Sequence, residues 1–382
     1  MAAGAGRAPG AAGVMGMLQN IRQEPADVAV VLQTILRPSL EIAVQSVYRQ
    51  DFPGRIHLLI GVDVAAGDRA VLDRLLAQCP DHVMVSILDP GYSTSRRHGG
   101  VYPNHFGGSL RTVLSYLANA RLVAYLDDND WFAADHLAAL KSAIKDKDWA
   151  WSGRWLVHPV LGVPICRDEW DSVGTRPGIN ADRYGGFVQP SGLMLDKEAC
   201  HFVLPLWSLA AFPDGSGEDR LVFDELHKTL AGAATDRFTC FCTLSEQALQ
   251  SPHHQRAFAE RQLAWVADAA LLVGLQGLLG QARDLAERGD WQGAGAAAEA
   301  ALAIHPHHPE ATYLLGRSRL AAGRKGDAIH ALMAAVALDD LRSDWQQVLA
   351  DALDDSRRRS EARTLRSRMA RRFPNMAGPS RG

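Results

Sequence analysis

Apolar residues in the first third of the chain alternate between short continuous runs and spaced patterns. The runs have strand length and lie at 28–32, 56–62, 83–88 and 122–126. Between them, apolar residues recur at three- and four-residue spacing, as in 40–47 and 110–117, which predicts amphipathic helices. Continuous apolar strands separated by helices are typical of a parallel sheet with both faces covered. We therefore predict an α/β domain that binds its ligand at the carboxyl edge of the strands.

The last third of the chain has a different pattern, in which Ala, Leu, Arg and Glu dominate. The segment around Gly289 matches the segment around Gly323 at an offset of 34 residues. The match includes Ala294 with Ala328, and a third, more basic copy places Ala362 on Ala328. This period is typical of tetratricopeptide repeats, whereas a plain helical bundle would have little reason to keep it. We predict stacked helical hairpins with a groove for a protein or peptide.

Residues 149–215, between these regions, are rich in Gly, Pro, Trp and Arg. We predict a loop-rich insert here, with a sheet-like pattern returning at 237–243. Three tryptophans of the insert could stack on a sugar ring or form small cores under loops: Trp151, Trp155 and Trp170. Cys240 and Cys242 share one face of the predicted strand. Because no second cysteine pair completes a zinc site, we interpret both as buried small apolar residues.

Composition limits the class of protein. The chain has 382 residues, 47% of them hydrophobic and 22% charged, which excludes wholesale disorder and suggests two or three domains. A net charge of −3 provides no bulk basic character, so we expect no nucleic-acid partner. We divide the chain into a flexible Ala/Gly-rich tail, a sheet domain, a repeat domain and a second flexible tail: 1–25, 26–256, 257–374 and 375–382.

The expected location follows from the cysteines and from the absence of a long apolar run. Five scattered cysteines do not indicate a disulfide framework, so we expect a reducing, cytoplasmic environment. No run approaches the roughly 18 to 20 apolar residues of a membrane span. The basic groups at 357–359 and 371–372 leave two alternatives open, which are peripheral contact with the inner face of a membrane or simple solvation of a terminal helix.

The strongest local signal for chemistry is the run Asp127-Asp128-Asn129-Asp130 at the end of a predicted strand. Three carboxylates within four residues repel one another, and burying them is costly without a cation. Such oxygen ligands suit Mn²⁺ or Mg²⁺. The alternative is an acidic turn that caps the following helix. A second acidic pair, Glu218-Asp219, has the same plain alternative, because acids favour a helix N-terminus.

Four segments, in order, resemble the family 2 glycosyltransferases of the GT-A fold. They are Gln33-Thr34 with Arg37-Pro38 after the first strand, Gly61-Val62-Asp63 after the second, the segment 126–131, and Gly217-Glu218-Asp219 before a helix. The resemblance covers about residues 27–250. It implies a Rossmann-like, mostly parallel sheet with helices on both faces. It also implies an enzyme that transfers a sugar from a nucleotide-diphosphate sugar, expected to be a UDP-sugar, to a hydroxyl of a saccharide or protein.

The resemblance also implies roles for individual residues. Those matched to nucleotide-sugar binding are Thr34, Arg37, Asp63, Arg96, Arg97, Asp127, Gln189 and Ser191. Arg96 and Arg97 have the alternative of lying in a solvated loop. Those matched to the metal site, for Mn²⁺ or Mg²⁺, are Asp128, Asn129, Asp130 and His253. Asp219, beside Glu218, matches the general base. It would take a proton from the acceptor hydroxyl as that oxygen attacks the anomeric carbon and inverts its configuration.

The chain departs from the family pattern at one position. Asn129 stands where the family often has Asp, so either Asp128 and Asp130 flank it as ligands or Asn129 supplies a weaker oxygen. This departure leaves a second function open, in which a weak or inactive transferase-like domain serves as an adaptor through its repeats. His253 and its neighbour His254 have the alternative of being exposed loop residues. A nucleotidyltransferase is disfavoured, because no Gly-rich phosphate loop follows the first strand.

Overall fold

The computed structural model describes residues 24–64, 66–105 and 107–373. The predicted tails, 1–25 and 375–382, lie outside these residues apart from Glu24 and Pro25. In the described part of the chain, nine strands form one sheet of order β3-β2-β1-β4-β8-β6-β9-β5, with β7 paired to β6. The strands are β1 (Val28–Thr34), β2 (Ile56–Val62), β3 (Val83–Leu88), β4 (Leu122–Asp127), β5 (Trp131–Phe132), β6 (Trp149–Val157), β7 (Pro164–Arg167), β8 (Leu193–Asp196) and β9 (Gly232–Thr243).

The strands β3, β2, β1 and β4 are parallel, as the apolar runs predict. All seven residues of β2 are buried, because helices cover both faces of the sheet. β1 lies between β2 and β4, with Thr34 opposite Val62 and Gln33 opposite Asp127. The polar residues that end these strands therefore meet at one edge of the sheet.

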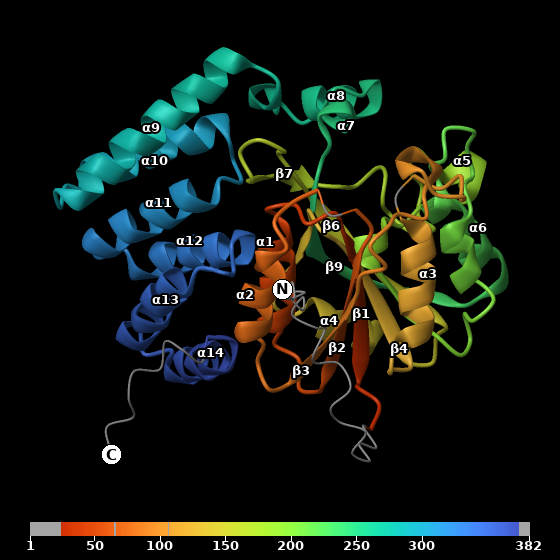
Figure 1. The fold of residues 1–382 in the computed structure, drawn as a ribbon. Coiled ribbons are helices and arrows are strands. Elements are labelled where there is room, and N and C mark those ends of the chain that lie inside the picture. The colour runs from red at the N-terminus through yellow and green to blue at the C-terminus, as the bar shows by residue number, and fades with distance from the viewer. Residues whose placement is uncertain (1–23, 65, 106, 374–382) are drawn as a thin grey trace, which may run out of the picture.

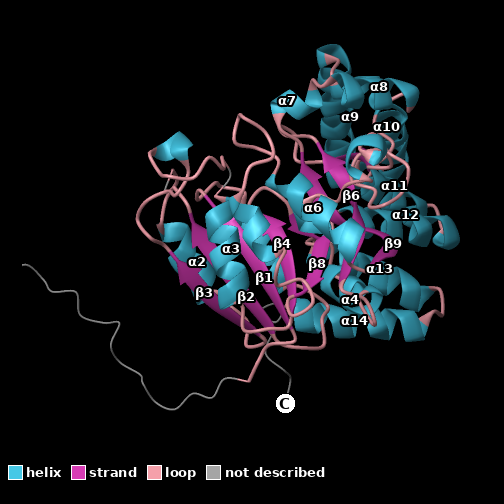
Figure 2. Cartoon of the chain, turned by 90° about the vertical axis from the view of Figure 1, so that its right-hand side faces the viewer, coloured by secondary structure: helices cyan, strands magenta, loops and turns pink. Residues whose placement is uncertain are grey.

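Two helical layers cover the sheet (Figure 2). Val28, Val30 and Leu32 point to one face, where they pack with α1 (Leu40–Tyr48), α2 (Ala70–Ala77) and α4 (His136–Ala143). Ala29 and Val31 point to the other, toward α3 (Gly108–Leu117) and α6 (Glu218–Thr229). Short helices lie in the connections: α5 (Ala181–Tyr184), α7 (Glu246–Leu249) and α8 (Pro252–Glu260).

The segment 149–215 differs from the prediction of a loop-rich insert, because β6, β7 and β8 belong to the sheet. β6 is almost entirely buried, antiparallel to β8 and parallel to β9, so the complete sheet is mixed. The abundance of Gly, Pro, Trp and Arg in the segment 149–215 suggested a loop, and an arginine such as Arg154 is not expected inside a sheet. The guanidinium of Arg154 is buried here because it pairs with Asp168 at 2.8 Å and with Asp171 at 2.7 Å.

Six helices follow and stack as antiparallel hairpins beside the sheet domain (Figure 1). They are α9 (Ala269–Glu287), α10 (Trp291–Ile304), α11 (Pro309–Ala321), α12 (Lys325–Leu338), α13 (Ser343–Asp355) and α14 (Arg359–Arg372). The turn inside each hairpin has one residue at positive φ, namely Gly289 (80°), Gly323 (74°) and Arg357 (63°), each 34 positions after the last. Ala294, Ala328 and Ala362 are fully buried, so the repeat inferred from the sequence is a repeat of structure.

The last hairpin returns to the sheet domain. Arg368 and Arg371 both pair with Asp51, at 2.9 and 2.5 Å. Arg372 is 7% exposed and donates to the carbonyl oxygens of Arg49 and Asp340. Two arginines that suggested membrane contact therefore hold the domains together. Among the described residues, no helix is both long and apolar enough to cross a bilayer.

Candidate functional site

Asp128 lies in the loop between β4 and β5, against the end of β1. Its Oδ2 accepts hydrogen bonds from the Thr34 hydroxyl at 2.8 Å and from the backbone N–H of Ile35 at 3.2 Å. Arg37 pairs with its Oδ1 at 3.2 Å. Burial raises the pKa of the Asp128 carboxyl, and the charge of Arg37 opposes this rise. The structure thus brings Thr34, Arg37 and Asp128 together.

Asp130 points away from Asp128 into the protein, where it is 2% exposed. Its Oδ2 accepts from the Ser191 hydroxyl at 2.7 Å and from Gln189 Nε2 at 2.8 Å, and its Oδ1 accepts from the Thr243 N–H at 2.9 Å. Burial raises the pKa of Asp130 to about 7. Asn129 is partly exposed and donates from Nδ2 to the Thr243 carbonyl at 3.2 Å.

Asp127 is the link between the acidic run and the helix that carries Glu218 and Asp219. Arg111 of α3 is 3% exposed and pairs with Asp127 Oδ1 at 2.6 Å. The charge of Arg111 lowers the pKa of both Glu218 and Asp219, while the charge of Asp127 raises it. Glu218 and Asp219 therefore lie near enough to the Arg111–Asp127 pair for both charges to act on them.

Glu218 and Asp219 occupy the first turn of α6, where Glu218 is buried and Asp219 is partly buried. Gly217 precedes them with φ of 88°, and a Cβ there would lie 2.6 Å from the ring of Phe212, so a glycine fits this turn. Burial, followed by the neighbouring Asp219, raises the pKa of Glu218 to about 7. Burial also raises the pKa of Asp219. Both groups retain protons at higher pH than ordinary carboxyl groups.

The remaining predicted residues are placed differently from one another. Asp63 follows β2 at the same edge, where its backbone N–H donates to the Thr34 carbonyl at 2.9 Å and its carboxylate accepts from the Ser93 hydroxyl at 2.8 Å. Arg96 and Arg97 are exposed in the loop after β3, and Arg96 donates to its own loop at Val101. His253 is exposed on α8. The structure does not bring these two arginines or His253 onto the acidic run.

The acidic run fits a hard cation only if part of the cation's ligand shell comes from outside the protein. Among the described residues, neither Asp128 nor His253 belongs to a group of three His, Cys, Asp or Glu side chains that lie close together. Asp127 and Asp128 adjoin, and the side chain of Asp127 is 29% exposed. One or two carboxylates plus phosphate oxygens and water are a usual shell for Mg²⁺. The donor set therefore fits a cation that arrives with a diphosphate rather than one held by protein alone.

Some residues of the site could not be found from the sequence. Arg111 has no motif of its own, and its only signal is a charged residue on the inward face of an amphipathic helix. Thr243 enters the site because β9 ends beside Asp130. Gln189 was predicted, and the structure adds that its Nε2 also donates to Asp127 Oδ2 at 3.1 Å.

The tryptophans of the insert form cores, in agreement with the second of the two alternatives for them. Trp151 is 7% exposed and stacks on Trp149 with ring centres 4.8 Å apart. Trp155 is 7% exposed and packs in one core with Phe241. Trp170 is 9% exposed and packs in the cluster that joins the sheet to α8.

Comparisons with known proteins find similarity at both ends of the chain. A tetratricopeptide repeat family model matches residues 285–352. The crystal structure of S. aureus TarS 1-349 is 12% identical over 93% of both chains, with a TM-score of 0.41, and its complex with UDP-GlcNAc has a TM-score of 0.42 at the same identity and coverage. A mutant Thermobaculum terrenum O-GlcNAc transferase is 26% identical over 28% of this chain and 21% of its own, with a TM-score of 0.27.

No curated protein matches this sequence. The function proposed below therefore rests on the geometry of the site and on the sequence motifs. The helical part of the chain is a tetratricopeptide-like repeat domain, and it follows a mixed, helix-covered sheet.

Proposed function

We propose that this chain is a glycosyltransferase that moves a sugar from a nucleotide-diphosphate sugar to a hydroxyl group of a saccharide or protein, with a UDP-sugar as the expected donor. One observation supports it most strongly. Thr34, Asp63 and the acidic run lie at the carboxyl edge of the sheet, and Arg111 links that run to Glu218 and Asp219. Nucleotides bind at this edge of open α/β sheets.

The residues of the site divide into donor-binding and proton-accepting groups. Thr34 and Asp63 offer oxygen atoms at the ends of β1 and β2, where they would hold the base and ribose. Asp219 would accept the proton of the acceptor hydroxyl, since its pKa is raised and it adjoins the donor edge. Glu218 would stabilise the first turn of α6 and adjust the charge around Asp219. Attack from the side of α6, opposite the leaving diphosphate, would invert the anomeric carbon.

A divalent cation completes the proposal. Mn²⁺ or Mg²⁺ held from Asp128, with Asn129 at the rim, would neutralise charge on the departing diphosphate. Arg37 and Arg111 flank this position and would keep the carboxylates oriented before the cation arrives. Asp130 faces the opposite way, so its expected part here is to position the loop through Ser191 and Gln189.

The test measures donor binding and turnover in the full chain. Thermal stability is followed with UDP-sugars in Mn²⁺, Mg²⁺ or chelator, and a donor at 100 times its dissociation constant should add about 2.7 kcal/mol. Asp219→Asn should lower turnover about 10²- to 10⁴-fold and keep donor binding, because it removes only the base. Asp128→Ala should weaken metal-dependent donor binding.

The matched control is Asp224→Asn, on the same helix, because Asp224 pairs only with Lys228 at the surface. It should behave like the wild type in both assays. Wild-type turnover in Asp219→Asn would remove the proposed base. A folded wild type that no nucleotide-sugar stabilises would favour the adaptor function.

A further inference from the structure

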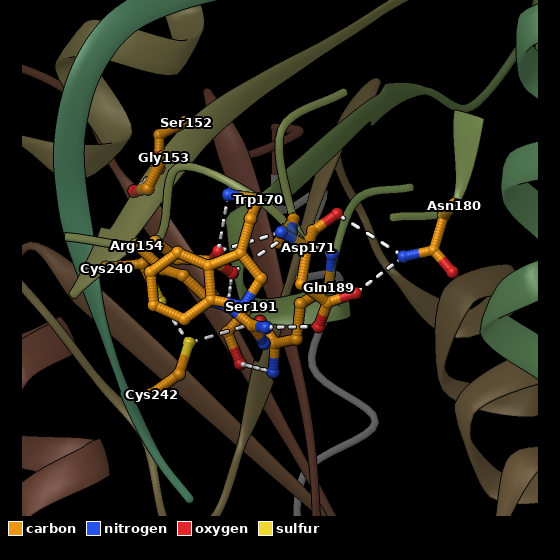
Figure 3. A network of polar contacts seen from close by, with 12 residues as sticks. Ser152, Gly153, Arg154, Trp170, Asp171, Asn180, Gln189, Ser191, Cys240 and Cys242 are labelled. Carbon is orange, nitrogen blue, oxygen red and sulfur yellow. Dashed lines mark hydrogen bonds and ion pairs between the residues drawn. The ribbon is translucent and has the colours of Figure 1, made fainter. Parts of the chain in front are cut away.

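Two thiols lie side by side behind the acidic run. Cys240 and Cys242, on β9, are 0% and 3% exposed, and their sulfur atoms are 3.4 Å apart. Figure 3 shows them next to each other beside Gln189 and Ser191. Side chains two positions apart on a strand usually stand parallel, separated by the rise of two residues. The two sulfur atoms are closer together than that spacing. The pair is therefore a compact dithiol at the inner wall of the site.

A carboxylate completes a group of three possible ligands. One oxygen of Asp130 and the sulfur atoms of Cys240 and Cys242 all lie within 4.8 Å of one another. Across the described residues, 24–64, 66–105 and 107–373, no other three His, Cys, Asp or Glu side chains gather so closely. Asp130 accepts three hydrogen bonds from nitrogen and hydroxyl donors, and the Cys242 thiol is a fourth donor to it. A cation that replaced the thiol proton would bind at this fourth acceptor position.

An amide oxygen lies on a fourth side of this group. Gln189 Oε1 accepts from the Cys242 thiol at 3.3 Å, so it points at the dithiol. The same side chain donates from Nε2 to Asp130 Oδ2 and to Asp127 Oδ2, which fixes the orientation of its amide. Two sulfurs and two oxygens therefore converge from β9, from the loop after β4 and from the segment before β8.

The chemistry of these donors selects the cation. Thiolates favour Zn²⁺ over Mg²⁺ or Mn²⁺, which prefer shells of oxygen atoms. Bond lengths of about 2.3 Å to sulfur and about 2.1 Å to oxygen would place tetrahedral ligand atoms about 3.6 to 3.8 Å apart. The three atoms already lie within 4.8 Å, so a side-chain shift of about 1 Å would bring them to a single ion.

The surrounding charge suits such an ion. Binding would release both thiol protons to solvent, which leaves two thiolates and one carboxylate against a charge of +2. Burial raises the pKa of both thiols, and the charge of Arg154, which also pairs with Asp168 and Asp171, acts against this rise. Oxidation of the pair is a weaker alternative, because oxidants react with exposed thiolates and both thiols are buried.

We propose that Cys240, Cys242 and Asp130, with Gln189 Oε1 as a fourth donor, form a binding site for a thiophilic divalent cation of the Zn²⁺ class. The site is distinct from the hard-cation position at Asp128. It would clamp β9 to the loop that carries the acidic run, because its ligands come from both. Its test needs no nucleotide-sugar, so the result is independent of the function proposed above.

The experiment uses Co²⁺ as a spectroscopic probe in the purified full chain after treatment with a chelator. We expect one equivalent of Co²⁺ to give a thiolate-to-cobalt charge-transfer band, and Zn²⁺ to displace it. Cys240→Ser and Cys242→Ser should each remove the band and weaken Zn²⁺ binding at least tenfold, since a hydroxyl is a poorer ligand than a thiolate. Cys200→Ser is the matched control, because Cys200 is an equally buried thiol in the other core, and it should keep the band.

A second measurement on the wild type covers the case in which the serine variants do not fold. Because four of the five thiols are buried, alkylation is followed over time, as local opening exposes each of them. Bound Zn²⁺ should slow the alkylation of Cys240 and Cys242 and leave the rates at Cys166 and Cys200 unchanged, with the sites identified by mass spectrometry. The proposal is overturned if Co²⁺ gives no thiolate band in a protein with five reduced thiols. It is overturned as well if the same two thiols are protected without metal through a mutual disulfide, or if Cys200→Ser loses the band.

Discussion

The carboxyl edge of the sheet and the helical repeats are stabilised in opposite ways. At the edge, several buried residues are polar, and the charge of Arg111, which pairs with Asp127, acts on Glu218 and Asp219 as well. In the repeats, the most buried positions are alanines such as Ala294 and Ala328, which let helices approach closely. The edge holds carboxyl groups in an environment that is costly for their charge, whereas the buried residues of the repeats are mostly apolar.

This contrast shows where sequence changes should matter for function and where for stability. Raised carboxyl pKa values in the edge mark groups that the fold keeps in a costly environment. At the buried alanines of the repeats, by contrast, close packing constrains only the size of the side chain. Each of the following predictions tests one side of this difference.

The largest effect is expected at the edge, from Arg111→Ala. Removing the guanidinium takes the paired counter-charge from Asp127 and a nearby positive charge from Glu218, and should cost about 3 kcal/mol, the lower end of the range for a broken buried pair, because Asp127 is partly exposed. Urea unfolding at pH 7.5 measures it. The loss should shrink at pH 5, where Glu218, whose pKa is about 7, becomes neutral.

Arg256→Ala is the control for this change. Arg256 pairs with Glu260 on α8, and both side chains are exposed, so its loss should cost less than about 1 kcal/mol. Equal losses in both variants would show that the edge carries no special charge cost.

The repeats should respond to size. Ala328→Leu adds bulk at a helix crossing where Ala328 is 0% exposed, and we expect a loss of about 2 kcal/mol from overpacking. Ala334→Leu, at an exposed position of the same helix, is the matched control and should change stability by less than about 0.5 kcal/mol. Thermal and urea unfolding distinguish them, and an unchanged Ala328→Leu would argue against close helix packing.

Acid should destabilise the protein at the turn between α10 and α11, which contains His305 and His308. Burial lowers the pKa of His305 to about 2 and of His308 to about 4, so both rings stay neutral in the folded chain while the unfolded chain binds protons below pH 6.5. Stability is therefore lost as pH falls, by about 1.4 kcal/mol for each ring between pH 7.5 and 5.5.

His308→Asn isolates this effect. His308 caps α11 through its ring nitrogen, and Asn keeps an acceptor for that role without titrating. The variant should lose about 1.4 kcal/mol less than the wild type over the same pH range. His330→Asn, at an exposed position, should keep the full pH dependence, and identical slopes in all three proteins would contradict the prediction.

The smallest effect is expected in the third hairpin. Arg357 has φ of 63° at the position where the first two hairpins have glycine. Arg357→Gly should raise stability by up to about 1 kcal/mol, because glycine adopts this conformation without strain. Arg357→Ala retains a Cβ and should bring no gain, so an equal rise in melting temperature for both variants would exclude backbone strain as the cause.

Much of the fold follows from local patterns. The four parallel strands and the helices around them appear as runs and periods of apolar residues, since burial on both faces demands continuous apolar strands. The 34-residue repeat was visible because each hairpin meets the same neighbours. β6 could not be predicted in this way, because Arg154 and its tryptophans lie inside the sheet only when Asp168 and Asp171 are beside them.

The site was predictable only in part. Thr34 and Asp63 could be named through the family resemblance and Asp128 through the acidic run, and the structure places all three at one edge. The roles assigned to them, and to Asp219, stay predictions. Arg111 was missed, and the grouping of Asp130 with Cys240 and Cys242 was not foreseen, because it joins residues more than one hundred positions apart.

The order of apolar and polar residues was enough to establish a helix-covered sheet followed by stacked hairpins, because each element depends on neighbours within a few positions or one repeat. Tertiary structure alone decided which carboxylates face the open edge and which turn inward. Asp128 turns toward β1 and Asp130 toward β9, although only one residue separates them. The reason is physical: a loop can direct adjacent side chains to opposite sides, and the partners that stabilise each one come from strands far away in the chain.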